Sequence, residues 1–72
     1  MDLNKAELGR EYRVKSILTP DRELNGFLFT LGLFSGEPVT VISRRRRGCT
    51  VAIKDSRYHI DDRLASAITV EC

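Results

Sequence analysis

The sequence lacks the long apolar run that a membrane-spanning helix requires. Such a helix needs about 18 consecutive apolar residues, and no segment of the 72-residue chain approaches that length. Residues 1–5 also lack the basic and then apolar pattern of a secretion signal. We therefore expect a soluble, intracellular protein with a cytoplasmic localisation.

The chain is also poor in residues that build disulfide scaffolds, metal centres or catalytic sites. Its two cysteines, Cys49 and Cys72, are far apart in the sequence, and in a reducing compartment we expect free thiols. Cations beside Cys49 would favour its thiolate, so a redox role is a minor alternative. His59 is the only histidine. Although Asp61 and Asp62 follow it, adjacent residues of a strand diverge, and a metal site needs three or four convergent ligands.

No motif in the sequence supports catalysis. There is no Ser-His-Asp set, no carboxylate pair with an arguable placement, and no Gly-rich loop of the kind that binds nucleotide phosphates. We therefore expect a protein that is not an enzyme, with no catalytic residues, no cofactor and no identifiable metal ligands, while transition metal ion binding stays open.

Positive charge is concentrated in one segment. The chain has 12 basic and 10 acidic residues, and four of the basic residues are consecutive, namely Arg44, Arg45, Arg46 and Arg47. Alternate residues of an extended segment point to opposite faces, so the four cannot share one surface. The run could dock an acidic protein face, lie near anionic lipid head groups, bind nucleic acid, or form a solvated hairpin tip. Nucleic acid is the least favoured partner, because the run has no aromatic neighbour for base stacking.

One amphipathic helix is predicted after residue 18. Thr19 is a plausible N-cap and Pro20 suits the first helical position. Apolar residues recur with helical spacing on one face, at Leu24, Phe27, Leu28 and Leu31. Gly32 can close the helix in the left-handed conformation, with Leu33 packing back in a Schellman-type contact, while Phe29 falls off the apolar stripe and is expected to be exposed.

Short alternating segments predict the remaining structure. Strands are expected over residues 10–18, with an end or a bulge near 16–18, and then from Pro38 towards the arginines, over 51–53, over 58–60 and over 68–70. A hairpin turn is expected at Asp55-Ser56, and a single helical turn over 61–65. The order is β–α–β–β–β–β, which predicts one mainly β domain over residues 1–72. Closure removes exposed edges, so a closed or nearly closed small barrel of about five strands is favoured.

Residues 29–41 resemble the signature of the FeoA family. They read Phe-Thr-Leu-Gly-Leu-Phe-Ser-Gly-Glu-Pro-Val-Thr-Val, which is similar to the family's helix ending in Leu-Gly-Leu, a two-residue spacer, a glycine and a strand with alternating valines. Leu8-Gly9 upstream and Gly48, Val51 and Ile53 downstream extend the resemblance, as do residues 56–70. Where family members often carry an Ala-Pro-Leu-Gly-Asp-Pro-like loop, residues 45–50 read Arg-Arg-Arg-Gly-Cys-Thr and keep only the glycine.

The resemblance implies an SH3-like barrel with one short helix between strands 1 and 2. It also implies a cytoplasmic accessory protein of FeoB, the membrane protein that imports ferrous iron and carries a GTPase domain. Such a protein would bind the cytoplasmic part of FeoB at the inner membrane surface and modulate iron uptake or GTPase activity. Two alternatives stay open. One is a basic regulatory domain that contacts nucleic acid, because a similar domain ends some metal-dependent repressors. The other is a self-assembling module that forms a homo-oligomer through an open barrel edge.

A partner surface is predicted at the end of the helix and at the arginine run. An interaction module needs an exposed apolar feature with a polar rim, and Phe29 and Phe34 are the best candidates. The predicted partner-binding residues are Phe29, Leu31, Gly32, Leu33, Phe34, Arg44, Arg45, Arg46 and Arg47. The alternative is that both aromatic rings complete the small core.

Overall fold

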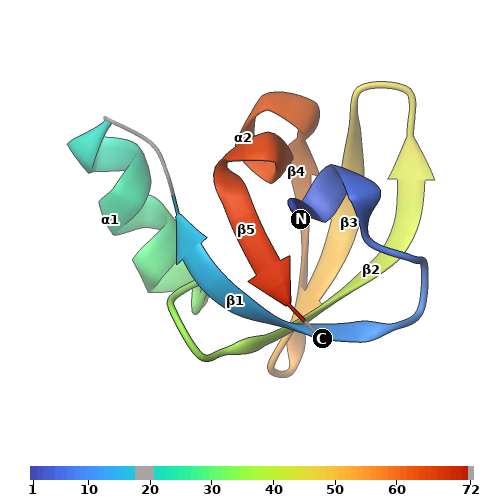
Figure 1. The fold of residues 1–72 in the computed structure, drawn as a ribbon. Helices are drawn as coiled ribbons and strands as arrows, with labels where there is room; N and C mark the ends of the chain where they lie inside the picture. Colours follow the sequence, from blue (N-terminus) through green and yellow to red (C-terminus); the bar gives the residue numbers. More distant parts are fainter. Residues whose placement is uncertain (18–20, 72) are drawn as a thin grey trace.

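The computed structural model describes residues 1–17 and 21–71 (Figure 1). The elements run in the order η1 (Leu3–Lys5), β1 (Glu11–Ile17), α1 (Arg22–Leu31), β2 (Pro38–Arg45), β3 (Gly48–Ile53), β4 (Ser56–Asp61), α2 (Asp62–Ala67) and β5 (Ile68–Glu71). The mainly β class and the helix between the first two strands are confirmed. The short 3-10 helix η1 was not predicted.

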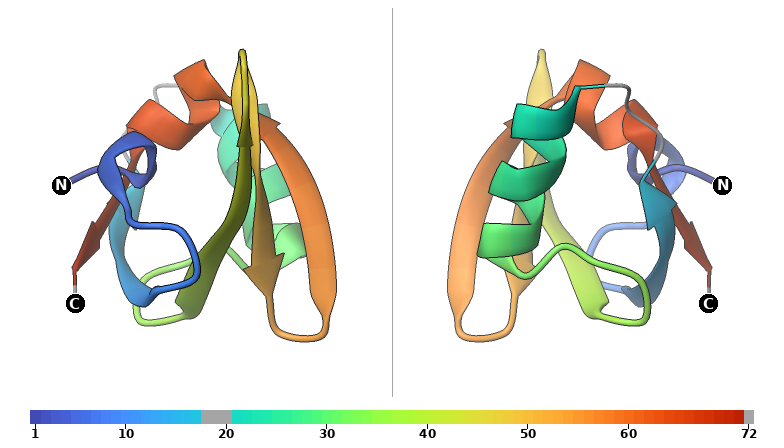
Figure 2. Two further views of the ribbon diagram at one scale, coloured as in Figure 1. Left: turned by 90° about the vertical axis from the view of Figure 1, so that its right-hand side faces the viewer. Right: turned by 90° about the vertical axis from the view of Figure 1, so that its left-hand side faces the viewer.

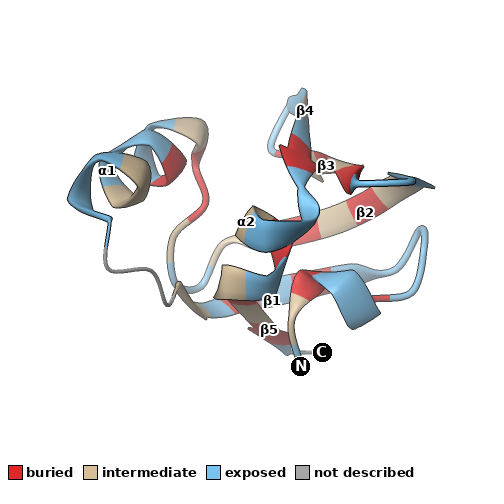
Figure 3. Ribbon diagram, turned by 90° about the horizontal axis from the view of Figure 1, so that it is seen from above, coloured by how far each residue is buried: buried red, intermediate tan, exposed pale blue. Residues whose placement is uncertain are grey.

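The five strands form one antiparallel sheet in the order β4-β3-β2-β1-β5. The sheet bends round on itself, so that β1 and β5 lie on one side of the molecule and β4 on the other (Figure 2). In the described residues the two edge strands, β4 and β5, do not pair with each other. The barrel is therefore open rather than closed, and the chain crosses the gap through α2, which leads from β4 into β5 (Figure 3).

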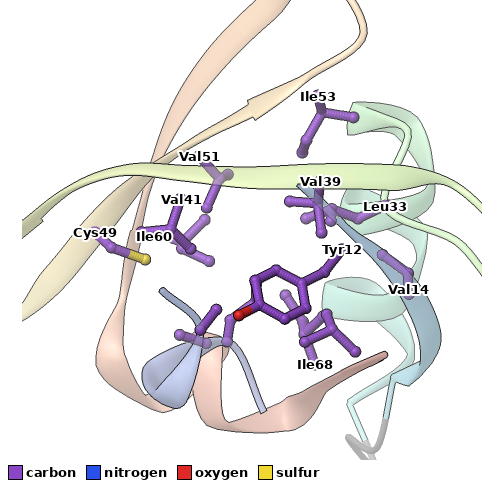
Figure 4. Close-up of a cluster of buried hydrophobic side chains, with 14 of the residues drawn as sticks. Tyr12, Val14, Leu33, Val39, Val41, Cys49, Val51, Ile53, Ile60 and Ile68 are labelled. Atoms are coloured by element: carbon purple, nitrogen blue, oxygen red, sulfur yellow. The ribbon is translucent and has the colours of Figure 1, made fainter. Parts of the chain in front are cut away.

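The inner face of the sheet carries a single apolar cluster (Figure 4). Val39 and Val41 of β2 lie opposite residues of β1 and β3, and both are buried because alternate strand positions face the core. Tyr12 is 2% exposed, and its hydroxyl accepts a hydrogen bond from the backbone N–H of Glu7 at 3.0 Å. The ring can therefore lie in the core without leaving its polar atom unpaired.

Two bulges interrupt the alternation. The register between β1 and β5 changes between Val14 and Ser16, which confirms the irregularity predicted near the end of the first strand. A second change lies in β2, between Val41 and Ser43. A bulge inserts one residue and reverses the in-and-out phase of those that follow. As a result, Arg44 pairs with the buried Cys49 and so faces the inner side, whereas Arg45 faces outward.

The N-terminal segment closes one end of the barrel. Leu3 is completely buried, and Ala6 is 4% exposed. The backbone N–H of Val70 donates to the carbonyl of Met1 at 2.8 Å, and the side-chain amide of Asn4 donates to the carbonyl of Asp62 at 3.0 Å. These bonds fix the segment against α2 and β5. From the sequence, this segment could be assessed only for a secretion signal, whereas in the structure Leu3 and Ala6 belong to the core.

Helix α1 begins later than predicted. Its N-cap is Asp21, whose Oδ1 accepts the backbone N–H groups of Glu23 at 3.0 Å and Leu24 at 3.1 Å. The predicted cap at Thr19 and first helical position at Pro20 lie outside the described residues. A carboxylate is a good cap because it also complements the positive end of the helix dipole.

The apolar stripe of α1 is narrower than its spacing indicated. Only Leu28 is buried, Leu24 and Leu31 are half-buried, and Phe27 is 55% exposed, so the prediction was wrong for Phe27. The reason is the open architecture, in which α1 stands beside the sheet instead of across it (Figure 3). The predicted exposure of Phe29 is confirmed, at 65%.

We expect Gly48→Ala to lower stability and Gly26→Ala to raise it. A methyl group at Gly48 would lie 2.3 Å from the backbone carbonyl oxygen of Ile60, so β3 and β4 would have to move apart, at a cost of about 1–3 kcal/mol. A methyl group at Gly26 meets nothing within 4 Å, and alanine in place of a helical glycine adds up to about 1 kcal/mol. Urea unfolding of both variants checks this pair, and equal midpoints would contradict it.

Candidate functional site

Phe29 and Phe34 form an aromatic pair on the surface. Their ring centroids are 5.0 Å apart and the ring planes are tilted by 35°, a geometry that favours the interaction of two aromatic rings. Phe29 projects from the last turn of α1, and Phe34 follows the helix end and is half-buried. The alternative in which both rings complete the core is therefore wrong for Phe29.

The end of α1 brings the two rings together. Gly32 has φ 94°, and its N–H donates to the carbonyl of Phe29 at 3.0 Å, while the N–H of Leu33 donates to the carbonyl of Leu28 at 2.9 Å. These two bonds define the predicted Schellman motif, which is confirmed. The turn reverses the chain, so that Phe34 comes back alongside the last turn of the helix.

The loop after the helix is tied to β1 by three hydrogen bonds. The N–H of Gly36 donates to the carbonyl of Val14 at 2.8 Å, Nη1 of Arg13 donates to the carbonyl of Gly36 at 2.9 Å, and the hydroxyl of Ser35 donates to the carbonyl of Lys15 at 3.1 Å. A loop held in this way keeps Phe34 in position before any partner arrives. Preorganisation of this kind reduces the entropy lost on binding.

Lys54 completes the site, and sequence reasoning missed it. Ile53 pairs with Ser56, so the β3–β4 turn consists of Lys54 and Asp55, one residue earlier than the predicted Asp55-Ser56. Lys54 has φ 54°, a left-handed conformation that few lysines adopt. Its ammonium nitrogen lies 5.2 Å from the centroid of the Phe34 ring, a cation–π contact. We call Phe29, Phe34 and Lys54 the aromatic corner.

Other predicted residues of this region position the corner without lying on its surface. Leu33 is 1% exposed and belongs to the core, Gly32 is buried, and Leu31 is half-buried. A methyl group at Gly32 would lie 3.2 Å from Cγ2 of Ile53. Glycine therefore serves both the left-handed turn and the close approach of the helix end to β3.

The four arginines do not act as one group. Arg44 donates from Nη2 to the carbonyl of Leu3 at 3.0 Å and to the carbonyl of Ala6. These carbonyls belong to the first residue of η1 and to the residue that caps its end, so the Arg44 guanidinium joins β2 to both ends of that short helix. Arg44 is exposed apart from these bonds, as are Arg45, Arg46 and Arg47 at the tip of the β2–β3 hairpin.

The structure does not bring the arginines to the aromatic corner. Strand β3 begins at Gly48 beside the arginine tip and ends at Ile53 beside the corner, so the two lie about 17 Å apart along the strand. Figure 1 shows the β2–β3 tip and the β3–β4 turn at opposite ends of the molecule.

Cys49 lies in the core and is 1% exposed. Burial raises the pKa of the Cys49 thiol above its ordinary value, and the nearby Arg44 cation offsets only part of that rise. Desolvation of the buried thiol therefore disfavours the reactive thiolate of the redox alternative. The burial of Cys49 could not be read from the sequence.

In residues 1–17 and 21–71, no group of three or more His, Cys, Asp or Glu side chains is placed to hold a metal ion. Within the same ranges, no helix is both long enough and apolar enough to cross a membrane. A cavity of about 550 Å³ lies between the start of α1 and α2, with Leu24 and Leu64 among its lining residues.

The family model of the FeoA domain matches residues 1–72. The chain belongs to the FeoA family. A comparison with curated protein sequences finds no match.

Solved structures show the same fold. A crystal structure titled iron uptake regulatory protein (FeoA) superimposes with a TM-score of 0.87 at 22% identity, over 99% of this chain and 95% of that one. FeoA from Chlorobium tepidum gives 0.89 at 22% identity, over 99% of this chain and 69% of that one. A manganese-dependent transcriptional repressor gives 0.87 at 21% identity, over 100% of this chain but 41% of that one. The predicted SH3-like fold is confirmed, as an open five-stranded sheet.

We expect Arg44→Met to destabilise the protein and Arg46→Met to leave stability nearly unchanged. The first substitution removes two hydrogen bonds from a charged donor to backbone carbonyls, and each such bond contributes about 1.5 kcal/mol or more. The second removes an exposed cation at a turn. Unfolding in urea measures both, and equal losses would show that Arg44 does not fix η1.

In a Cys72→Ser background, Cys49→Ala should make stability less sensitive to alkaline pH. A thiol whose pKa is raised in the fold stays neutral there, whereas the unfolded thiol ionises as pH rises through its ordinary pKa. Ionisation of the thiol then favours the unfolded state. The stability that the buried Cys49 thiol contributes is therefore present below the ordinary pKa and is lost as the pH rises above it. Unfolding midpoints from neutral to alkaline pH, with and without the Cys49→Ala change, check the difference. Parallel curves would contradict it.

Proposed function

We propose that this FeoA-family protein is an accessory factor of ferrous-iron transport that docks on the cytoplasmic part of a FeoB-type transporter. Docking at the aromatic corner would modulate iron uptake or the transporter's GTPase activity. Membership of the FeoA family supports the link to ferrous-iron transport. A cytoplasmic location is part of the proposal, since the partner surface of the transporter lies there.

The observation that carries the docking site is the exposed, preorganised pair of phenylalanine rings. The ring centroids of Phe29 and Phe34 are 5.0 Å apart, and the ammonium group of Lys54 lies over the Phe34 ring. Anchors at protein interfaces are typically aromatic side chains surrounded by polar groups. Here Lys54 and the hydrogen-bonded loop after the helix are the polar groups around the two rings. The partner would supply an apolar pocket for the rings and a carboxylate for Lys54.

Phe27 offers an internal comparison for this proposal. It is 55% exposed on the same helix, but it is two residues from Phe29 and so lies about 200° around the helix axis. It has no ring contact in the described residues, whereas Phe29 lies against Phe34. Exposure alone therefore does not define the corner, because a single flexible ring loses more freedom on binding than a pair that is already ordered.

The rival function is a regulatory domain that contacts nucleic acid. The resemblance to a manganese-dependent repressor concerns the fold, at 21% identity. Because Arg44 bonds within the fold, three arginines of the run remain for phosphates, and binding would depend on salt with a log–log slope of roughly −3. The absence of an aromatic residue in the run disfavours this function.

Calorimetry with the cytoplasmic domain of the cognate ferrous-iron transporter tests the proposal. We expect Phe29→Ala and Phe34→Ala each to weaken binding by about tenfold or more, as loss of an interface anchor does, and Phe27→Ala to change it by less than about threefold. Unfolding of each variant in urea controls for lost stability. Equal losses in all three variants, or no binding by the wild-type protein, would overturn docking at the aromatic corner.

A further inference from the structure

The outward side of β2, β3 and β4 carries cations among small residues. Because paired strand residues share a face, the register defines three rows across these strands. The rows are Arg45–Gly48–Asp61, Ser43–Thr50–His59 and Thr40–Ala52–Arg57. The bulge residue Ile42 is half-buried beside them, and apart from the cations, His59 and Asp61 the three rows hold only small residues.

The arginine tip continues this surface. Arg45 ends β2 on the outward face, and Arg46 and Arg47 form the turn that follows. Across the ladder from Arg45, Gly48 leaves space that the imidazole of His59 covers, with Nε2 3.1 Å from where a methyl group would be. We call Arg45, Arg46, Arg47, Arg57 and His59 the basic face.

Two carboxylates lie near these cations. Oδ1 of Asp61 accepts the backbone N–H of Leu64 at 2.7 Å and caps α2. Asp62 follows it, and its backbone N–H donates to the carbonyl of Arg47 at 2.9 Å. Neither carboxylate forms an ion pair with an arginine of the basic face within the described residues. Four guanidinium groups therefore remain available to an outside anion.

We propose that the basic face rests on an anionic lipid surface and contacts its phosphate head groups. The chemistry of the face favours lipid over other polyanions. A nucleic-acid platform would need exposed aromatic rings for base stacking, and the three rows hold none. The hot spots of protein interfaces are enriched in Trp and Tyr as well as Arg, and the rows hold no such aromatic residue. Separated guanidinium groups on one outward side can each contact a phosphate head group of a lipid surface, and each contributes independently.

This inference rests on the proposed function for its setting, since a partner of a membrane transporter works beside a bilayer. The arginine tip and the aromatic corner do not compete, because β3 places them at its opposite ends, while Arg57, which pairs with Ala52, lies nearer the corner. The protein can therefore meet a lipid surface and a protein partner at once.

Co-sedimentation with vesicles tests the proposal without the transporter. Vesicles of phosphatidylcholine alone are compared with vesicles that also contain anionic phosphatidylglycerol, at low and moderate salt. We expect binding to the anionic vesicles only, weaker at the higher salt. The variant Arg45→Ser/Arg46→Ser/Arg47→Ser should bind roughly a hundredfold more weakly, and Arg57→Gln on β4 about fivefold more weakly.

The matched control is Lys5→Ser/Lys15→Ser/Arg22→Ser, which removes the same charge at three exposed positions on other elements. It should lose less than about tenfold, because long-range attraction falls off within a Debye length. Equal losses in the two triple variants would show attraction to net charge alone and overturn the proposal. Failure to bind anionic vesicles would overturn it too, as would tighter, variant-sensitive binding to a DNA duplex at the same salt. Phe34→Ala should leave vesicle binding unchanged, so failure here is distinct from failure of docking.

Discussion

The bulge in β2 decides how the charged end of this small protein is organised. If Ile42 held a regular strand position between Val41 and Ser43, Arg45 instead of Arg44 would face the inner side. Because of the bulge, the guanidinium of Arg44 reaches the carbonyls of Leu3 and Ala6 and holds the N-terminal segment over the end of the core. A chain of this length buries little apolar surface, so the completely buried Leu3 is a substantial part of what stabilises the fold.

The opposite end of β3 depends on a different backbone constraint. Gly32 takes a left-handed conformation that ends α1, and a side chain at that position would be strained and would also press on Ile53. Lys54, also left-handed, then extends over the turn towards Phe34. Stabilisation of the helix end and exposure of the two rings have the same cause, because the turn that satisfies the last carbonyls of α1 also brings Phe34 back to Phe29.

Local patterns in the sequence predicted the elements because those patterns act over a few residues. Alternating valines, the Leu-Gly-Leu end of the helix and the break near Ser16 are all visible in the chain, and the structure confirms each. The roles of Arg44, Leu3 and Lys54 depend on contacts between distant segments and on a one-residue bulge. The periodicity of the sequence carries no information on long-range contacts or on the bulge. Arg44 could therefore not be distinguished from the three arginines that follow it.

The two candidate surfaces also differ in how well they could be predicted, because one depends on a local pattern and the other on the pairing of distant strands. Phe29 was identifiable because it falls off a helical stripe, which is a local property. The basic face is assembled by register, with Arg45, His59 and Arg57 contributed by separate strands. If the proposed transporter and lipid contacts both form, the aromatic corner and the arginine tip at the two ends of β3 would act together. Contact at one end raises the effective concentration at the other, so neither surface needs high affinity of its own. A protein too small for one large interface can in this way use two modest ones.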